Sequence, residues 1–530
     1  MTIRAACLVG ILVLAANGAP LLAASPTAPF VGTKAGTLRG VREDAVDVFR
    51  GVPYAEAPVG ALRWRAPVAA KSWSGVRPAI EYGASCYQEW PARTFGPYTS
   101  EFVDTPRPSE DCLYLNVWSP AQRTAKVPVM VWIHGGGFSG GSGALSIYDG
   151  THLASQGIMV VTINYRVGPF GFLAHPELTR EARGTAAGNY GLQDMIAALR
   201  WVQDNAAAFG GDAANVTIMG QSAGAMAVNA LVASPQAKGL FARAIAQSGS
   251  GMGIPAIPLA EAENNGERLF KATGAATLTE LRALPPEKIQ SANPFYFGSP
   301  PPGTPPRIEL RPVLDGGVLP ADYSQPGAPV ASAVPIITGF NADEFMPSNE
   351  VTAAEFQQSV RARYGADADR LLSLYPHATN EEAAQSARAL VRDVYMTATY
   401  RWAVEHSRIG GRPVYAYLFT HPSPVAKPPG FGTFHSSEIP YLFGVLDRNH
   451  RPYDDRDEQI AKQLQSYWLS FIRTGDPNGG PGARWNPVDR NVVQVMGLGD
   501  DAGPRPPVSS NQRFQALMTY ADSGGRLSIR

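Results

Sequence analysis

Six short apolar runs, rich in β-branched residues, recur along the chain between segments with a helical pattern. They cover residues 127–134 (VPVMVWIH), 158–165 (IMVVTINY), 216–220 (VTIMG), 241–247 (FARAIAQ), 334–340 (VPIITGF) and 414–419 (VYAYLF). Runs of this kind are typical of strands that are buried on both faces, as in a parallel sheet. Residues 191–205 (GLQDMIAALRWVQDN) show the helical pattern. The alternation predicts an α/β fold with a mostly parallel central sheet and helices on both faces.

The segment Gly220-Gln-Ser222-Ala-Gly224 lies directly after one of these strands and directly before a helical pattern. In a sharp strand-to-helix turn, small residues on both sides leave the serine exposed at the apex. The start of the following helix then presents backbone N–H groups and a positive dipole end. This context favours Ser222 as a nucleophile over the alternative of an ordinary glycine turn.

A second glycine-rich segment, His134-Gly-Gly-Gly137, follows the first predicted strand. Acyl transfer needs preorganised donors for the oxyanion of its tetrahedral intermediate, and glycines let backbone N–H groups approach closely. An H-G-G-G loop upstream of the serine is typical of lipases and esterases. The alternative is a flexible glycine turn with no role in catalysis.

A serine hydroxyl needs a base, and the base needs an acid to orient it. In this type of fold the order along the chain is serine, acid, histidine. Asp343 and Glu344 both follow the strand at 334–340, and position alone does not choose between them. His421 and His435 both follow the strand at 414–419; spacing gives His435, in a glycine-containing loop, only a modest advantage.

Several longer motifs occur in one order along the chain, at residues 49–60 (FRGVPYAEAPVG), 109–118 (SEDCLYLNVW), 164–173 (NYRVGPFGFL), 188–194 (GNYGLQD), 209–212 (FGGD), 435–444 (HSSEIPYLFG) and 474–478 (TGDPN). Through these motifs the chain resembles the type-B carboxylesterases, a family that includes cholinesterases and bacterial p-nitrobenzyl esterases. The resemblance extends over nearly all of the chain after its first residues.

The resemblance implies an α/β-hydrolase fold and hydrolysis of a small-molecule carboxylic ester, with no metal and no organic cofactor. It implies a catalytic triad of Ser222, Glu344 and His435. It also implies an oxyanion hole formed by the N–H groups of Gly136, Gly137 and Ala223, and a cysteine pair at Cys86 and Cys112.

Two positions depart from the family pattern. Gln221 stands where the family commonly has glutamate, which bears on the charge preference of the pocket. Phe345 stands where the family's acid motif commonly has glycine, and phenylalanine cannot take every backbone conformation open to glycine. Neither departure removes a catalytic group.

Other functions are compatible with parts of this pattern. Some relatives, such as neuroligins, keep the fold as adhesion modules without a complete triad. The presence of serine, acid, histidine and oxyanion loop favours an enzyme. Lipase, thioesterase, amidase and toxin-ester hydrolase activities use the same machinery, which the fold does not distinguish.

The first residues predict an export signal. A short basic start is followed by an apolar stretch at 5–16 and by small residues up to Ser25. We expect cleavage of residues 1–24, a single domain over 25–530, and a secreted or periplasmic protein without stable membrane insertion. Outside this signal the cysteines are Cys86 and Cys112, whose pairing suits an oxidising compartment; two separate buried thiols are the alternative.

The charge balance gives no reason to expect nucleic acid as a partner. Lys and Arg together number 45, as do Asp and Glu, so the formal net charge is zero. Charged residues make up 17% of the chain and hydrophobic ones 45%, which indicates a well-buried globular protein. The sequence makes no prediction of the oligomeric state.

Overall fold

The computed structural model describes residues 28–89, 95–183, 187–251, 254–294, 303, 307–344, 350–425 and 430–528. The predicted export signal and Phe345 lie outside these residues. Within the described part of the chain, no helix is both long enough and apolar enough to cross a bilayer.

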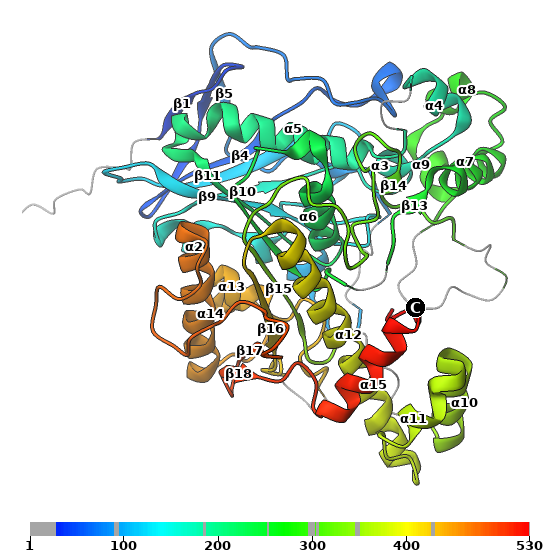
Figure 1. The fold of residues 1–530 in the computed structure, drawn as a ribbon. Helices are drawn as coiled ribbons and strands as arrows, with labels where there is room; N and C mark the ends of the chain where they lie inside the picture. Colours follow the sequence, from blue (N-terminus) through cyan, green and yellow to red (C-terminus); the bar gives the residue numbers. More distant parts are fainter. Residues whose placement is uncertain are drawn as a thin grey trace, which may run out of the picture.

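A central sheet of eleven strands dominates the structure (Figure 1). Its spatial order is β18 (Gly503–Arg505), β17 (Val495–Leu498), β16 (Val414–Phe419), β15 (Ile336–Asn341), β12 (Arg243–Gln247), β11 (Gly211–Gln221), β9 (Val127–Ile133), β10 (Met159–Ile163), β8 (Tyr114–Pro120), β4 (Val46–Pro53) and β3 (Val41–Glu43). The strands from β17 to β10 pair in parallel, whereas the pairs at both edges are antiparallel. The predicted α/β fold is confirmed, and all six predicted strands belong to this parallel centre.

Alternate residues of the central strands enter two different cores, as expected for a sheet that is covered on both faces. In β9, Val129, Val131 and Ile133 pack into one core. Met130 and Trp132, which point the other way, pack into the second core. The continuous apolar run in the sequence therefore reflects burial on both sides.

Helices cover both faces of the sheet (Figure 1). The first core packs against α3 (Gly168–Phe172), α5 (Tyr190–Asn205), α6 (Ala223–Ala233) and part of α12 (Asn380–Gly410). The second core packs against α1 (Ser100–Val103), α2 (Thr151–Ser155), α13 (Ile439–Phe443) and α14 (Asp455–Thr474). The predicted helix at 191–205 is confirmed as α5.

The remaining elements lie around this centre. A third apolar cluster joins the start of α12 to α10 (Ala353–Tyr364), α11 (Ala368–Leu372) and α15 (Asn511–Asp522). The other helices are α4 (Pro176–Glu181), α7 (Leu259–Thr273), α8 (Leu278–Ala283) and α9 (Pro286–Ser291). Small sheets are formed by β1 (Phe30–Gly32) with β2 (Thr37–Arg39) and β5 (Val76–Pro78), by β6 (Ser85–Cys86) with β7 (Pro108–Ser109), and by β13 (Ile257–Pro258) with β14 (Val313–Leu314).

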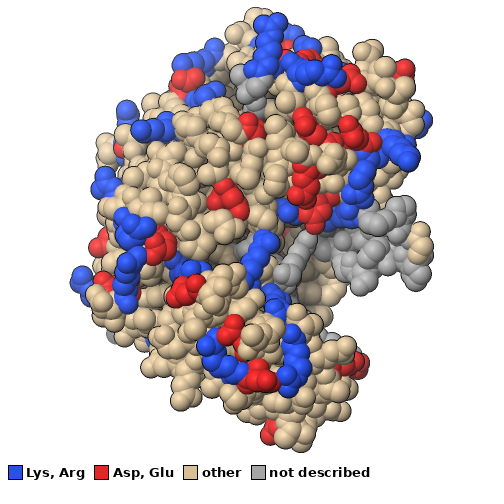
Figure 2. Space-filling view, turned by 45° about the vertical axis from the view of Figure 1, so that its right-hand side comes forward, with Lys and Arg blue, Asp and Glu red and all other residues tan. Residues whose placement is uncertain are grey.

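Acidic and basic side chains lie interspersed over the face drawn in Figure 2. This arrangement agrees with the balanced charge of the sequence.

Candidate active site

The turn between β11 and α6 carries Ser222. Its backbone has φ 59° and ψ −126°, a strained conformation for a residue other than glycine. A Cβ added at Gly224 would lie 2.1 Å from the carbonyl oxygen of Ile133, and one added at Gly220 would lie 2.6 Å from the backbone of Gly224. Both flanking glycines are therefore required by close backbone packing, and the predicted strand-turn-helix context of Ser222 is confirmed.

The glycine loop after β9 lies against this turn. A Cβ added at Gly135 would lie 3.1 Å from Ser222 Cβ. Gly136 and Gly137 have φ values of 112° and 62°, in the region that favours glycine. No described residue accepts a hydrogen bond from the N–H of either glycine. The N–H of Ala223, the first residue of α6, has no acceptor within its own helix.

His134 supports this loop and does not titrate in the neutral range. Burial lowers the pKa of His134 to about 4, and its Nδ1 hydrogen-bonds to the Gly135 carbonyl oxygen at 2.8 Å. Its ring stacks on Tyr165 at a centroid distance of 4.3 Å. A neutral, stacked imidazole fixes the start of the loop without adding charge to the site.

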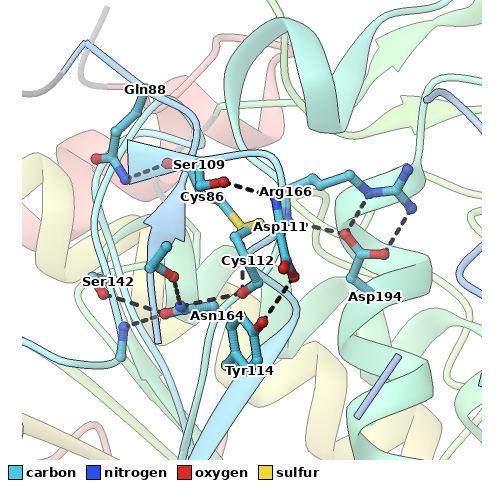
Figure 3. The surroundings of a disulfide bond; sticks show 12 residues. Cys86, Gln88, Ser109, Asp111, Cys112, Tyr114, Ser142, Asn164, Arg166 and Asp194 are labelled. Atoms are coloured by element: carbon cyan, nitrogen blue, oxygen red, sulfur yellow. Dashed lines mark hydrogen bonds and ion pairs between the residues drawn. A yellow bond between two sulfur atoms is a disulfide. The ribbon is translucent and has the colours of Figure 1, made fainter. Parts of the chain in front are cut away.

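The predicted disulfide between Cys86 and Cys112 is confirmed (Figure 3), and residues near it hydrogen-bond to the chain just after the glycine loop. Two residues beyond Cys86, Gln88 accepts a hydrogen bond from Gly141 N–H at 2.7 Å and donates one to the Gly141 carbonyl at 2.8 Å. The Cys112 carbonyl accepts a hydrogen bond from Asn164 Nδ2 at 3.3 Å. Asn164 Oδ1 in turn accepts one from Gly143 N–H at 2.9 Å. The crosslink thus anchors the chain that follows the glycine loop.

Glu344 follows β15 and reaches the histidine loop. Its Oε2 lies 3.0 Å from Nδ1 of His435, and the side chain of Glu344 is completely buried. Its other oxygen, Oε1, accepts a hydrogen bond from Asn341 N–H at 2.8 Å and one from the Ser248 hydroxyl. The structure therefore brings together the two residues that the resemblance selected.

Asp343 points elsewhere and joins the two loops. Its Oδ2 accepts a hydrogen bond from Thr433 N–H at 2.9 Å, and Arg392 pairs with Oδ1 at 3.0 Å. A Cβ added at Gly432 would lie 2.4 Å from Asp343 Oδ2, so a glycine is needed in the histidine loop at this contact. Asp343 thus fixes the backbone just before His435 and does not touch the imidazole.

His421, the rival base, has carboxylates at both ring nitrogens. Nε2 lies 2.9 Å from Asp457 in α14, and Nδ1 lies 2.8 Å from Asp500 after β17. A ring held in this way is part of an ion-pair network and is not arranged to take a proton from a serine.

The described hydrogen bonds connect His435 to the nucleophile turn through Gln221, whose Nε2 lies 3.1 Å from His435 Nε2. They include no bond between Ser222 Oγ and the imidazole. Such bonds are often long in enzymes without substrate and tighten in the reacting complex.

Two polar residues of the site were not found by sequence reasoning. Ser248 follows β12 at the same edge of the sheet, and the rule that polar residues after parallel strands meet there could have identified it. Glu438 lies fully buried three residues after His435; its carboxyl accepts hydrogen bonds from Gln247 at 2.9 Å and from Asn341 at 2.6 Å. Burial raises the pKa of Glu438 to about 7. Nothing in the local sequence indicates its burial.

Among the described residues, no group of three or more His, Cys, Asp or Glu side chains is placed to hold a metal ion.

Comparison with known proteins places this arrangement in a family. Residues 27–515 match the model of the Carboxylesterase family. This chain belongs to the carboxylesterase family. Because the match covers nearly the whole chain, the carboxylesterase relationship includes both the central sheet and every loop of the candidate site.

Curated relatives of this carboxylesterase are named as esterases or hydrolases. It is 35% identical to the fumonisin B1 esterase of Sphingopyxis macrogoltabida over 89% of this chain and 86% of that protein. It is 35% identical to the para-nitrobenzyl esterase of Bacillus subtilis (strain 168) over 85% of this chain and 91% of that protein. The phenmedipham hydrolase of Pseudarthrobacter oxydans is 36% identical over 90% of this chain and 96% of that protein.

Solved structures of esterases resemble this fold over nearly its whole length. A PNB esterase structure matches with a TM-score of 0.78 and 32% identity over 93% of this chain and 99% of that chain. A thermophilic PNB esterase matches with a TM-score of 0.77 and the same identity over 93% of this chain and all of that chain. The protein is a serine ester hydrolase of the α/β-hydrolase fold that acts on small-molecule carboxylic esters.

Proposed function

We propose that Ser222, His435 and Glu344 are the catalytic triad of this carboxylesterase. The observation that carries the proposal is the 3.0 Å contact between His435 Nδ1 and the buried Glu344 carboxylate, with the His435 ring against Gln221, the residue before Ser222. Glu344 holds one tautomer of the imidazole and stabilises the imidazolium that forms during the reaction. Its hydrogen bonds from Asn341 and Ser248 fix the carboxylate in turn.

The reaction follows from these roles. Ser222 Oγ attacks the ester carbonyl carbon while His435 Nε2 takes the hydroxyl proton. The bond to the alcohol breaks as His435 returns the proton to the leaving oxygen, and an acyl-enzyme remains. Water, deprotonated by His435, then attacks the acyl carbon. The bond from this carbon to Ser222 Oγ breaks as His435 returns the proton to Oγ, which releases the acid and regenerates the enzyme.

We assign the oxyanion hole to the N–H groups of Gly136, Gly137 and Ala223. The two glycine donors have no acceptor among the described residues, and the loop lies against Ser222. Donors fixed before the reaction need no reorganisation when charge develops on the substrate oxygen.

The proposal also covers the processing, the domain organisation and the location of the enzyme. We propose cleavage of residues 1–24, a single catalytic domain over 25–530, and a secreted or periplasmic location. The Cys86–Cys112 disulfide supports an oxidising compartment. The names of the relatives suggest p-nitrobenzyl esters and fumonisin B1 as first substrates to test.

The decisive experiment is labelling of the purified enzyme with a fluorophosphonate probe, followed by peptide mapping. We expect the label on Ser222 and none on Ser222→Ala, which should also lose at least about 10⁴-fold in kcat because a triad acts as a unit. Labelling at another serine, or full activity of Ser222→Ala, would contradict the assignment.

A further inference from the structure

Gln221 is one of the two residues that depart from the family pattern, and it contacts the imidazole of His435. Its side chain is buried, with 3% of the residue exposed. The amide nitrogen Nε2 lies 3.1 Å from His435 Nε2 and 3.4 Å from His435 Nδ1.

These two distances fix where the amide lies. An atom on the in-plane lone-pair axis of Nε2 at 3.1 Å would be much farther from Nδ1 than 3.4 Å. An atom nearly equidistant from both nitrogens in the ring plane would overlap Cε1, which lies between them. The amide nitrogen therefore lies over the face of the ring, and it does not occupy the in-plane direction that faces a proton donor.

The backbone and side chain of Gln221 are held from two sides. The residue pairs with Gln247 in the ladder between β11 and β12. A Cβ added at Gly135 would lie 3.2 Å from Gln221 Oε1 and 2.8 Å from its carbonyl oxygen, so the side chain is confined between the oxyanion loop and the imidazole. The amide thus has little room to leave the ring.

We propose that Gln221 is a positioning residue that fixes the plane of the His435 ring and keeps an uncharged group on its face. An amide N–H directed at an aromatic face favours the electron-rich neutral ring. A carboxylate at the same place would favour the imidazolium. The glutamine therefore keeps His435 available as a neutral base at lower pH than a glutamate would. This inference rests on the proposed role of His435.

Other groups that bear on the imidazole stay the same when residue 221 is changed. Among the described residues they include Glu344 at Nδ1 and Glu438 three residues further along the chain, while the Tyr98 hydroxyl donates to the backbone carbonyl of His435 at 3.0 Å. A change in pH dependence on substitution of Gln221 alone can therefore be attributed to the group on the ring face.

The test is the pH profile of kcat/KM with an uncharged p-nitrophenyl ester for wild type, Gln221→Glu and Gln221→Met. The exposed Gln515→Glu in α15 is the matched control for an added carboxylate. We expect the acid limb of Gln221→Glu to move up by about one pH unit, as a carboxylate within a few ångströms of a histidine does. Gln221→Met, which keeps the length without the amide, should move it by less than about half a unit and lower the plateau by about tenfold because the ring plane is less fixed. Gln515→Glu should match wild type.

Coincident acid limbs for Gln221→Glu and wild type would overturn the inference. If Gln221→Glu does not fold, a Gln221→Met enzyme with the plateau and profile of wild type would overturn it equally. The rate of fluorophosphonate labelling against pH separates this result from failure of the triad. A label on Ser222 with an unshifted profile refutes only the role of Gln221, whereas a label elsewhere refutes the triad.

Discussion

The two histidines that follow β16 differ in what surrounds their rings. His435 has one carboxylate, Glu344, at Nδ1 and an amide over its face. His421 has a carboxylate at each nitrogen, Asp457 and Asp500. A single carboxylate orients an imidazole so that it can pass a proton on, whereas carboxylates at both nitrogens favour the charged ring. The two rings therefore differ in the number of acid partners at their nitrogens, and this difference is consistent with the proposed role of His435 as the base.

The largest expected effect tests this contrast directly. We expect His435→Ala to lower kcat by at least about 10⁴-fold, since the base and nucleophile act as one unit. His421→Ala should stay within about tenfold of wild type, because its ring belongs to an ion-pair network. Turnover of p-nitrophenyl butyrate and melting temperature should be measured for both. The reverse ranking of the two variants would show that the histidine loop is wrongly assigned.

The next largest effects are expected at the neighbouring acids Asp343 and Glu344, because only Glu344 contacts His435. Glu344→Gln should lower kcat by about 10³–10⁴-fold with folding intact, because the imidazole loses its orienting carboxylate. Asp343→Asn should leave kcat nearly unchanged and lower the free energy of unfolding by about 1–2 kcal/mol, since it weakens bonds to Thr433 and Arg392. Steady-state kinetics and urea denaturation of both variants distinguish these roles. If only Asp343→Asn lost most of its kcat, Asp343 would be the acid of the triad and Glu344 the structural residue.

Glu438, the second carboxyl beside His435, provides a stability test. Burial raises its pKa from 4.5 to about 7, so the folded protein binds this proton more tightly than the unfolded chain does. The free energy of unfolding should therefore fall as pH rises from about 4.5 to about 7. Glu438→Gln removes this loss and should be more stable than wild type at pH 8 by up to about 3 kcal/mol. The amide nitrogens of Gln247 and Asn341 donate to the Glu438 carboxylate, so the new N–H₂ group requires one of these amides to turn. Turning Gln247 would present its Oε1, which has no partner among the described residues.

Urea denaturation between pH 5 and pH 8 measures this difference, with the exposed Glu458→Gln of α14 as the matched control. Parallel stability curves for Glu438→Gln and wild type would mean that folding does not change the proton affinity of Glu438, which contradicts a raised pKa in the folded protein.

The smallest effect is expected at His421. Burial alone would lower the pKa of His421, but hydrogen bonds to Asp457 and Asp500 outweigh it and raise the pKa. The stabilisation from this network should be complete below about pH 6.5 and should be lost as pH rises through the folded pKa. His421→Gln should therefore cost about 1 kcal/mol at pH 5.5 and less at pH 8.5. Denaturation midpoints at the two pH values, compared with the exposed His450→Gln, measure the change; an equal cost at both would show that the ring is not charged in the fold.

The amino-acid sequence alone was enough to predict the strands of the parallel centre, the Ser222 turn and the glycine loop. These features depend on short-range patterns: burial on both faces produces a continuous apolar run, and Gly220 and Gly224 are needed because their Cβ positions are occupied by neighbouring backbone. Local chemistry of this kind can be recognised without knowing how distant segments meet.

Which acid meets which histidine depends on contacts between distant segments of the fold. Residues alone left Asp343 against Glu344 and His421 against His435, and only the family resemblance chose between them. Glu344 and His435 are 91 positions apart, and their contact depends on two loops that Asp343 and Thr433 join. The burial of Glu438 and the place of Gln221 over the imidazole likewise arise from packing between separate elements. A sequence pattern fixes what one segment can do, but the partner of a side chain across a long loop is set by the whole fold.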